Sequence, residues 1–259
     1  MSEPILLRDD ADAVATLTLN RPAQRNALSR PMIAALSSAL EEIGRDRAVR
    51  AVVIAANGPG YCAGHDLKEI RAKPDRAFYD LLFAECSALM TRIVRQPQPV
   101  IACVHGIATA AGCQLVASCD LAVASEDARF ATPGVNIGLF CSTPMVALSR
   151  AVSRKHAMEM LLTGDLMDAE TARRFGLVNR VVPAAALEAE TQALAAKIAG
   201  KSGAVVKIGK EAFYRQLEMG LDEAYDYTSG VIAANMEMRD AEEGVDAFIA
   251  KREPVWQHR

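Results

Sequence analysis

The sequence predicts an α/β protein with a parallel sheet and an α-helical C-terminal region, on three observations. Residues 13–124 alternate short apolar runs with segments of helical spacing, which is typical of strand–helix–strand units. Two runs, 51–55 and 100–104, are apolar at every position, as expected of strands buried on both faces. Beyond about residue 144, helical spacing dominates.

The residue pattern in the N-terminal part of the sequence predicts a strand followed by a helix. Residues 13–19 alternate between the two faces of a strand, and Pro22 follows the break that ends it. Ser29 is a preferred helix N-cap residue, and Pro31 suits the first helical turn. Apolar residues then recur on one helical face, namely Met32, Ile33, Leu36, Leu40 and Ile43.

The remaining elements continue this pattern. Up to residue 124 we expect a helix at 78–94, a strand at 100–104, a helix at 113–117 and a strand at 121–124. Further on we expect helices at 145–152, 155–162, 169–175, 185–198, 205–216, 221–238 and 241–251, with one strand at 178–182. A shift in composition near residue 200 divides the chain into a core at 1–200 and a helical region at 201–259 for oligomer contacts.

The composition limits the class of protein. A chain of 259 residues with 51% hydrophobic and 24% charged residues is typical of a globular protein. The net charge of −3 argues against nucleic acid as a partner, and no apolar run is long enough for a membrane span. The N-terminus lacks a signal-peptide pattern, so we expect a cytoplasmic protein, or a mitochondrial matrix form without its transit peptide.

Metal and nucleotide sites have weak support. The six cysteines form no C-x-x-C pair and the four histidines are scattered, so no metal site is expected. Gly58, Gly60 and Gly64 follow a strand, but their spacing is one residue too long for a dinucleotide loop. The Gly200–Ser202 triplet follows a helix, whereas a phosphate loop follows a strand. An NAD-type dehydrogenase therefore rests on an imperfect glycine loop alone.

Two loops carry the expected chemistry. One spans 61–69 after the strand at 51–55, and the other spans 104–114 and opens a helix. Both follow parallel strands at their carboxyl ends, where ligands bind in α/β folds. Two backbone N–H groups converging there would form an oxyanion hole, aided by the helix dipole. Tight turns with small residues packed for stability are the alternative explanation of either loop.

The chain resembles the enoyl-CoA hydratase/isomerase family, the crotonase superfamily, over nearly its whole length. The segments that carry the resemblance are 20–28, 62–67, 106–122, 130–138, 161–169, 176–178 and 243–254. It implies the crotonase fold, a ClpP-like spiral of ββα units with C-terminal helices at subunit contacts. It also implies an acyl-CoA thioester as substrate, no cofactor beyond the CoA of that substrate, and a homotrimer or dimer of trimers. Segments 64–69, 108–120 and 132–144 are typical of one subgroup.

The resemblance also implies roles for individual residues. The oxyanion N–H groups belong to His65 and to Ala111, where the family usually has glycine. Arg25 and Ala27 lie where the family holds the CoA pyrophosphate and adenine, although Arg25 is equally explained as a solvated loop cation. The full substrate-binding set is Arg25, Ala27, Ala63, Asp66, Leu67, Gly112 and Gly134, of which Ala63, Asp66 and Leu67 line the pantetheine path.

The sequence departs from the family at the acid–base positions. Hydratases of the family use two glutamates, at the positions of Gln114 and Gly134. Gln114 can hold a water molecule but cannot accept its proton, and Gly134 has no side chain. Other members carry an aspartate at the position of Ser142. The His65 ring has a useful pKa range, but a ring that points to solvent or to Asp66 is the plainer expectation.

Other candidate groups have plainer explanations. Cys141 and Ser142 are candidates near the acyl pocket, although a packed pocket wall is the plainer explanation of both. Glu85 and Asp80, on the helix at 78–94, are candidates to supply a carboxylate, with a solvated helix face as the alternative.

The sequence thus predicts an enzyme, nominally an enoyl-CoA hydratase or isomerase, that stabilises a thioester enolate with backbone N–H groups. The missing glutamates argue against conventional hydration. A decarboxylase or thioesterase needs less from a general base and is one alternative. A non-catalytic acyl-CoA-binding or regulatory protein is the other.

Overall fold

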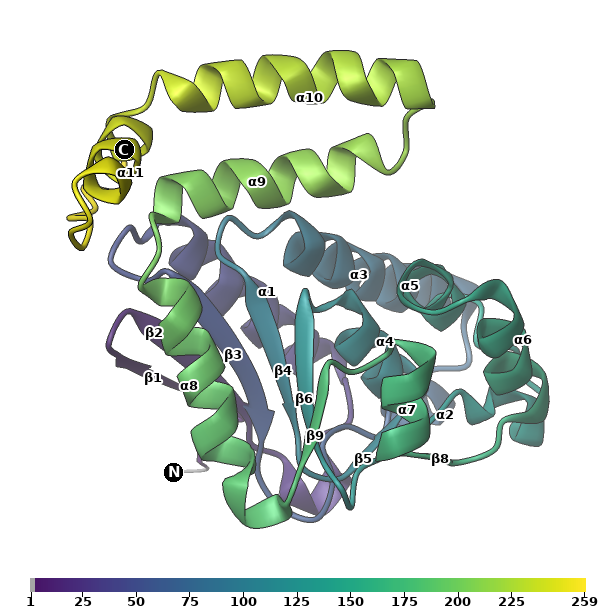
Figure 1. Ribbon diagram of the computed structural model, residues 1–259. Helices are drawn as coiled ribbons and strands as arrows, with labels where there is room; N and C mark the ends of the chain where they lie inside the picture. The colour runs from purple at the N-terminus through teal and green to yellow at the C-terminus, as the bar shows by residue number, and fades with distance from the viewer. Residues whose placement is uncertain (1–2) are drawn as a thin grey trace.

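A six-stranded sheet forms the centre of this computed structural model, which describes residues 3–259 (Figure 1). The strand order is β1-β2-β3-β4-β6-β9, and every pair is parallel except β1–β2. The strands are β1 (Leu6–Ala11), β2 (Val14–Leu19), β3 (Ala51–Ala56), β4 (Val100–Val104), β6 (Leu121–Ser125) and β9 (Arg180–Val182). The predicted parallel sheet is confirmed, with the antiparallel β1 added at its edge.

A second, three-stranded sheet has the order β5-β7-β8. Its strands are β5 (Ile107–Thr109), β7 (Arg129–Ala131) and β8 (Met167–Asp168). The sequence pattern predicts none of them, because two or three residues are too few to show a period. The expectation of a single strand after residue 144 was therefore wrong. β1 also escapes prediction, since five of its six residues are solvent-exposed and charged or small side chains dominate it.

The helices agree in type with those expected, and their ends differ by a few residues. They are α1 (Arg30–Arg45), α2 (Leu67–Ala72), α3 (Arg76–Arg95), α4 (Ala111–Ser118), α5 (Pro144–Ala151), α6 (Arg154–Thr163), α7 (Ala169–Phe175), α8 (Leu187–Ala199), α9 (Gly203–Gln216), α10 (Leu221–Met236) and α11 (Arg239–Ile249). The short α2 was not expected. Among residues 3–259, no helix has the length and apolarity needed to cross a bilayer.

The large sheet is covered on both faces, which explains its continuous apolar strands. In β3, Val52 and Ile54 join the larger core cluster, which includes buried residues of α1 and α3. The alternate residues Ala51 and Val53 join a smaller cluster with Leu187 of α8. Because successive side chains of a strand point to opposite faces, every position of β3 needs an apolar residue.

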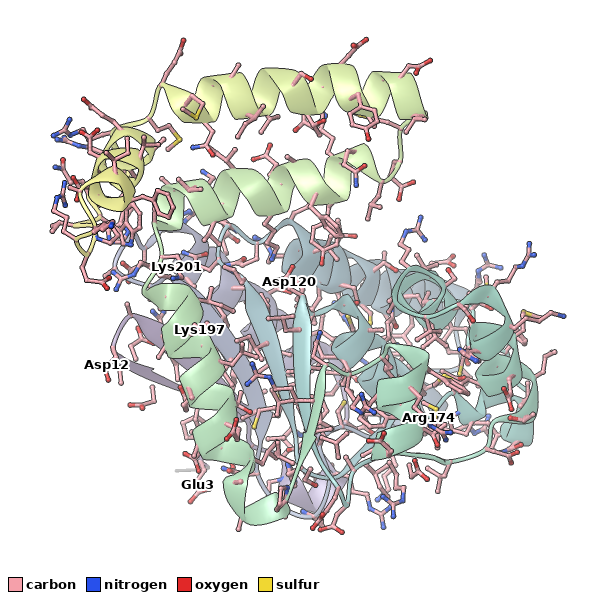
Figure 2. The ribbon with its side chains drawn as sticks, viewed as in Figure 1. Glu3, Asp12, Asp120, Arg174, Lys197 and Lys201 are labelled. Carbon is pink, nitrogen blue, oxygen red and sulfur yellow. The ribbon has the colours of Figure 1, made fainter. Side chains whose placement is uncertain are left out.

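Asp120, just before β6, anchors the C-terminal helices to the core (Figure 2). The Lys210 ammonium of α9 donates to Asp120 Oδ2 at 2.6 Å, and the Tyr214 hydroxyl donates to Oδ1 at 2.9 Å. Val100 N–H also donates to this carboxylate, at 2.7 Å. The Lys210 and Asp120 side chains are only 8% and 14% exposed, so the pair is shielded from water. α9 thus lies on the core, with α10 beyond it (Figure 1). The division of the chain into a core at 1–200 and a helical region at 201–259 stays a prediction.

We expect Lys210→Met to lower the free energy of unfolding by about 3 kcal/mol, because the largely buried Asp120 carboxylate would lose its counter-charge. Arg173→Met is the matched control, since the Arg173–Glu170 pair is 48% and 56% exposed. This solvent-screened pair should contribute far less to stability than the buried one. Urea unfolding of both variants at neutral pH measures the difference. Equal losses would contradict a structural role for the buried pair.

Candidate active site

The two loops predicted to carry the chemistry lie in direct backbone contact. Cys62 N–H donates to the carbonyl of Ile107 at 3.0 Å, and Thr109 N–H donates to the carbonyl of Cys62 at 2.9 Å. A Cβ atom on Gly112 would lie 2.0 Å from the Cys62 oxygen. No residue but glycine fits there, because the first turn of α4 packs against the loop after β3.

This contact brings the Ala111 amide close to Gly64, the residue before His65. Gly64, with φ of +94°, lies so close to α4 that its Cβ would be 3.3 Å from Ala111 N. His65 follows Gly64 directly, and Ala111 is the first residue of α4. Neither amide donates a hydrogen bond to any group among residues 3–259. Two free backbone donors therefore flank Gly64.

Ala110 fixes the direction of the Ala111 amide. Its φ of 51° and ψ of −118° are unusual for a residue with a Cβ atom and cost about 1–3 kcal/mol. Its N–H donates to the carbonyl of Ala131 at the end of β7, at 2.9 Å. The surrounding contacts thus impose a strained turn at the start of α4, as is common where a site must be preorganised.

Besides a ring nitrogen of His65, two buried polar atoms near these amides have no hydrogen-bond partner within residues 3–259. One is Oε1 of Gln114, which lies at the end of the first turn of α4 and is 4% exposed. The other is Oγ1 of the fully buried Thr132, next to Ala131. Such atoms normally pair with protein, water or a ligand. Sequence reasoning did not select Thr132 as a site residue, although it lies in the 130–138 segment that carries the family resemblance.

No side chain fits at Gly134, one of the two positions where the hydratases were expected to carry glutamate. A Cβ there would lie 2.8 Å from the Leu139 carbonyl oxygen and 2.9 Å from Cys141 Sγ. Burial raises the pKa of the Cys141 thiol, so little thiolate is present at neutral pH. Ser142 is exposed, and its hydroxyl donates to the Phe140 carbonyl at 3.3 Å. Its expected catalytic role stays a prediction.

The ring of His65 points neither to solvent nor to Asp66, so the plainer expectation was wrong. Its Nδ1 lies 3.3 Å from the carbonyl oxygen of Leu28, and its Nε2 is buried without a partner. The ring meets Phe83 of α3 edge-on, with centroids 5.4 Å apart. Burial lowers the pKa of this imidazole below its ordinary value.

The nearby carboxylates are already engaged. Asp66 caps α2 by accepting from the N–H groups of Lys68 and Glu69, and it pairs with Arg21 at 3.3 Å. Glu85 accepts two hydrogen bonds from Arg30, at 2.6 and 2.7 Å.

The Arg30 guanidinium lowers the pKa of Glu85 below its ordinary value. Asp80 pairs with Arg76 on the exposed side of α3. Glu85 and Asp80, expected as possible bases, are therefore ion-pair partners.

The residues expected to bind CoA gather beside these loops. Ala63 N–H donates to the Arg25 carbonyl at 3.0 Å, which joins the loop before α1 to the loop after β3. Arg25 adopts a positive φ of 48° and is exposed. Ala27 is buried, whereas Leu67 at the start of α2 is 53% exposed. Their binding roles stay predictions.

We expect Gly134→Ala to lower the free energy of unfolding by about 1–3 kcal/mol, because the added methyl group overpacks the loop at Leu139 and Cys141. The control is Gly209→Ala in α9, where an added Cβ would meet no atom within 4 Å. It should stabilise the helix by about 0.5–1 kcal/mol. Thermal and urea unfolding give both values. If Gly134→Ala proves neutral, the close packing at this position is refuted.

Comparison with known proteins agrees with the predicted resemblance. The enoyl-CoA hydratase/isomerase family profile matches residues 9–259. Enoyl-CoA hydratase domain-containing protein 3, mitochondrial, of Xenopus laevis is 49% identical over 255 residues, which cover 98% of this chain and 87% of that protein. A probable enoyl-CoA hydratase of Rhizobium meliloti is 36% identical, with 100% of both chains covered.

Solved structures give the same result. An enoyl-CoA hydratase of Mycobacterium smegmatis superposes with a TM-score of 0.96 at 57% identity, covering 98% of this chain and 99% of the other. Human enoyl-CoA hydratase domain-containing protein 3 superposes with a TM-score of 0.95 at 47% identity, covering 98% and 100%. The protein thus has the crotonase fold. Its sequence resembles the subgroup that this human protein typifies. The chain belongs to the enoyl-CoA hydratase/isomerase family.

Proposed function

We propose that this protein is an enzyme acting on an acyl-CoA thioester, whose carbonyl oxygen is held by the N–H groups of His65 and Ala111. The observation that supports this most is that both amides flank Gly64 without a partner of their own. When a proton or a group leaves the α carbon, negative charge develops on that oxygen. A preorganised donor stabilises such charge by about 2.7–4 kcal/mol. The CoA is part of the substrate, so the proposal needs no separate cofactor.

The residues at the acid–base positions favour reactions other than conventional hydration. Hydration needs a group that accepts a proton from water, and the Gln114 amide does not do so. At Gly134 the contacts with Leu139 and Cys141 leave no room for a carboxylate side chain. Decarboxylation and thioester hydrolysis depend less on a carboxylate pair. Decarboxylation develops an enolate and thioester hydrolysis a tetrahedral oxyanion, and backbone donors stabilise the charge in both cases, so we place the reaction in this pair.

A non-catalytic acyl-CoA-binding or regulatory protein is the second candidate function. The observation that favours it is the loss of both carboxylates while the two backbone donors remain. The two candidates differ in turnover. An enzyme converts at least one thioester of an enoyl, malonyl and saturated acyl panel, whereas a binder converts none and still prefers a thioester to free CoA.

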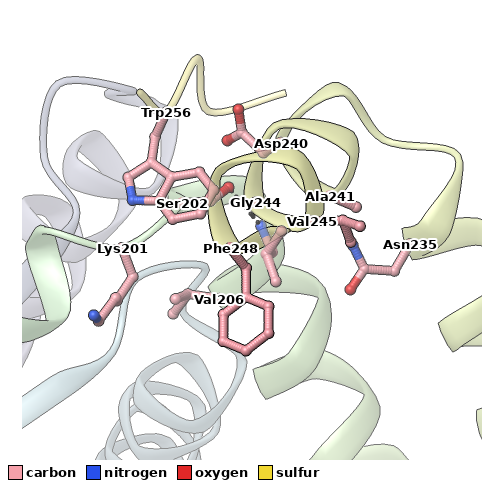
Figure 3. A pocket seen from close by; sticks show the side chains of 11 residues that line it. Lys201, Ser202, Val206, Asn235, Asp240, Ala241, Gly244, Val245, Phe248 and Trp256 are labelled. Atoms are coloured by element: carbon pink, nitrogen blue, oxygen red, sulfur yellow. Dashed lines mark hydrogen bonds between the residues drawn. The ribbon is translucent and has the colours of Figure 1, made fainter. Parts of the chain in front are cut away.

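For the assembly, we propose a homotrimer or a dimer of trimers formed through the C-terminal helices. Large apolar side chains are exposed there, with Leu221 at 73% and Phe248 at 86%. A cavity of about 670 Å³ between α9 and α11 is lined by Val206, Phe248 and Trp256 (Figure 3). Such exposed apolar surface is typical of a protein contact.

The vertebrate relatives are named as mitochondrial proteins. For this chain, a location in the cytoplasm or in the mitochondrial matrix stays a prediction.

We expect Ala111→Pro to lower kcat/KM on the best thioester by about 10²–10³-fold, because proline removes one oxyanion donor. Proline is tolerated at the first position of a helix, so α4 should remain folded. Ala111→Gly, which keeps the N–H group, is the control and should stay within a few-fold of wild type. Steady-state kinetics over the thioester panel, with circular dichroism as a folding check, gives the comparison. Unchanged kinetics in Ala111→Pro would rule out the proposed donor.

A further inference from the structure

The chain exposes more surface than a monomeric protein of its size. Its solvent-accessible area is 13873 Å², whereas a monomeric protein of 27.8 kDa is expected to expose about 11,000 Å². A surplus of about 2,800 Å² is what a stable assembly would hide on each copy. Because a ring places each copy between two neighbours, the surplus would be shared by two contacts, with about 1,400 Å² for each.

α10 carries an apolar stripe that its own chain does not bury. None of the 16 residues of this helix is buried. Its large apolar side chains are 58–73% exposed, namely Leu221, Tyr225, Ile232 and Met236. At about 100° per residue these four side chains fall on one side of the helix, and we call them the α10 stripe. Since helices in proteins are stabilised mainly by packing of an apolar face, the stripe requires a covering surface.

A second apolar surface lies elsewhere on the molecule. It comes from residues 137–140 and from α5 and α6, and we call it the 137–162 surface. Its side chains are 42–60% exposed, namely Ile137, Leu139, Phe140, Val146, Met158 and Leu162. α5 packs on α6, and α6 packs on residues 133–137, so these side chains lie on adjoining elements. Figure 1 shows α10 at the top of the molecule and α6 at the right of the core.

A ring requires two different surfaces on each copy. In a ring of three, a patch on one copy meets a different patch on the next, whereas a two-fold dimer pairs a patch with itself. The α10 stripe and the 137–162 surface meet this requirement. Aromatic and Met side chains are enriched in protein contacts, and both surfaces contain them, with Tyr225 on the first and Phe140 on the second.

The charges beside the two surfaces are opposite. α10 has three acidic residues and no basic one, and Asp222 and Asp226 lie along one side of the stripe. α6 has one acidic residue and begins with Arg154 and Lys155. Lys155 lies on the same helical face as Leu162, two turns further on. Opposite charges at the rim of a contact fix its register, whereas pairing of α10 with itself would bring acidic residues together.

Resting on the ring assembly of the proposed function, we propose that the α10 stripe of each copy docks on the 137–162 surface of the next copy. The contact buries both apolar surfaces. It also reaches the candidate site, because Leu139 belongs to the 137–162 surface and its carbonyl oxygen packs closely on Gly134. Each copy thus covers a loop that borders the site of its neighbour.

The test is the mass of the full chain's assembly in solution, measured by analytical ultracentrifugation. Ile232→Arg places a positive charge in the stripe, facing the basic residues of α6. Leu162→Asp places a negative charge on the other surface, facing the acidic residues of α10. Both positions are more than half exposed, so each variant should fold, and circular dichroism checks this. Met158→Asp replaces Leu162→Asp if the latter does not fold. The matched control is Leu7→Asp, an exposed β1 position outside both surfaces.

We expect wild type and Leu7→Asp to sediment as three or more chains, and each surface variant to sediment as a single chain. A mixture of Ile232→Arg and Leu162→Asp contains one intact stripe and one intact 137–162 surface, so it should form a complex of two chains. A mixture of Ile232→Arg and Tyr225→Arg contains no intact stripe and should give single chains.

Three results would overturn the inference. If the folded 137–162 variant sediments like wild type, that surface is not part of the contact, and the proposed ring stands without it. If the mixture of the two surface variants gives only single chains, the two surfaces do not meet. If wild type is a single chain or a dimer, the proposed ring itself is refuted, and the inference with it.

Discussion

The contact between the loop after β3 and the first turn of α4 is the constraint on which the site depends. Gly112 lies against the Cys62 carbonyl and Gly64 against Ala110, at distances that admit no side chain. Backbone hydrogen bonds between Cys62 and the β5 segment hold this approach in place. Because main-chain atoms make the contact, the two free amides are fixed by the fold rather than by side-chain rotamers. Such preorganised donors need no reorganisation when charge develops.

In the proposed function, the same contact lets the site hold a thioester without the two carboxylates. The proposed thioester cradle is made of backbone and tolerates change in the side chains around it. The loop at Leu139 and Cys141 packs closely on Gly134, while Gln114 keeps a polar atom in a buried environment.

The sequence predicted the features that depend on long apolar runs or on motifs. β3 and β4 were expected because strands buried on both faces need apolar residues throughout, and His65 and Ala111 were expected from the family resemblance. What the sequence did not predict depends on neighbours distant in the chain. The pairing of Glu85 with Arg30, the crowding at Gly134 and the buried Nε2 of His65 arise from packing between separate elements. β5, β7 and β8 are too short to show a period.

The most direct measurement of the central claim is a crystal structure of the protein with an acyl-CoA thioester bound, refined without restraints on the ligand contacts. The account predicts that the thioester oxygen lies between the two amides, about 2.7–3.1 Å from both His65 N and Ala111 N. A thioester oxygen more than about 3.5 Å from either nitrogen, with the ligand fully ordered, would contradict the account.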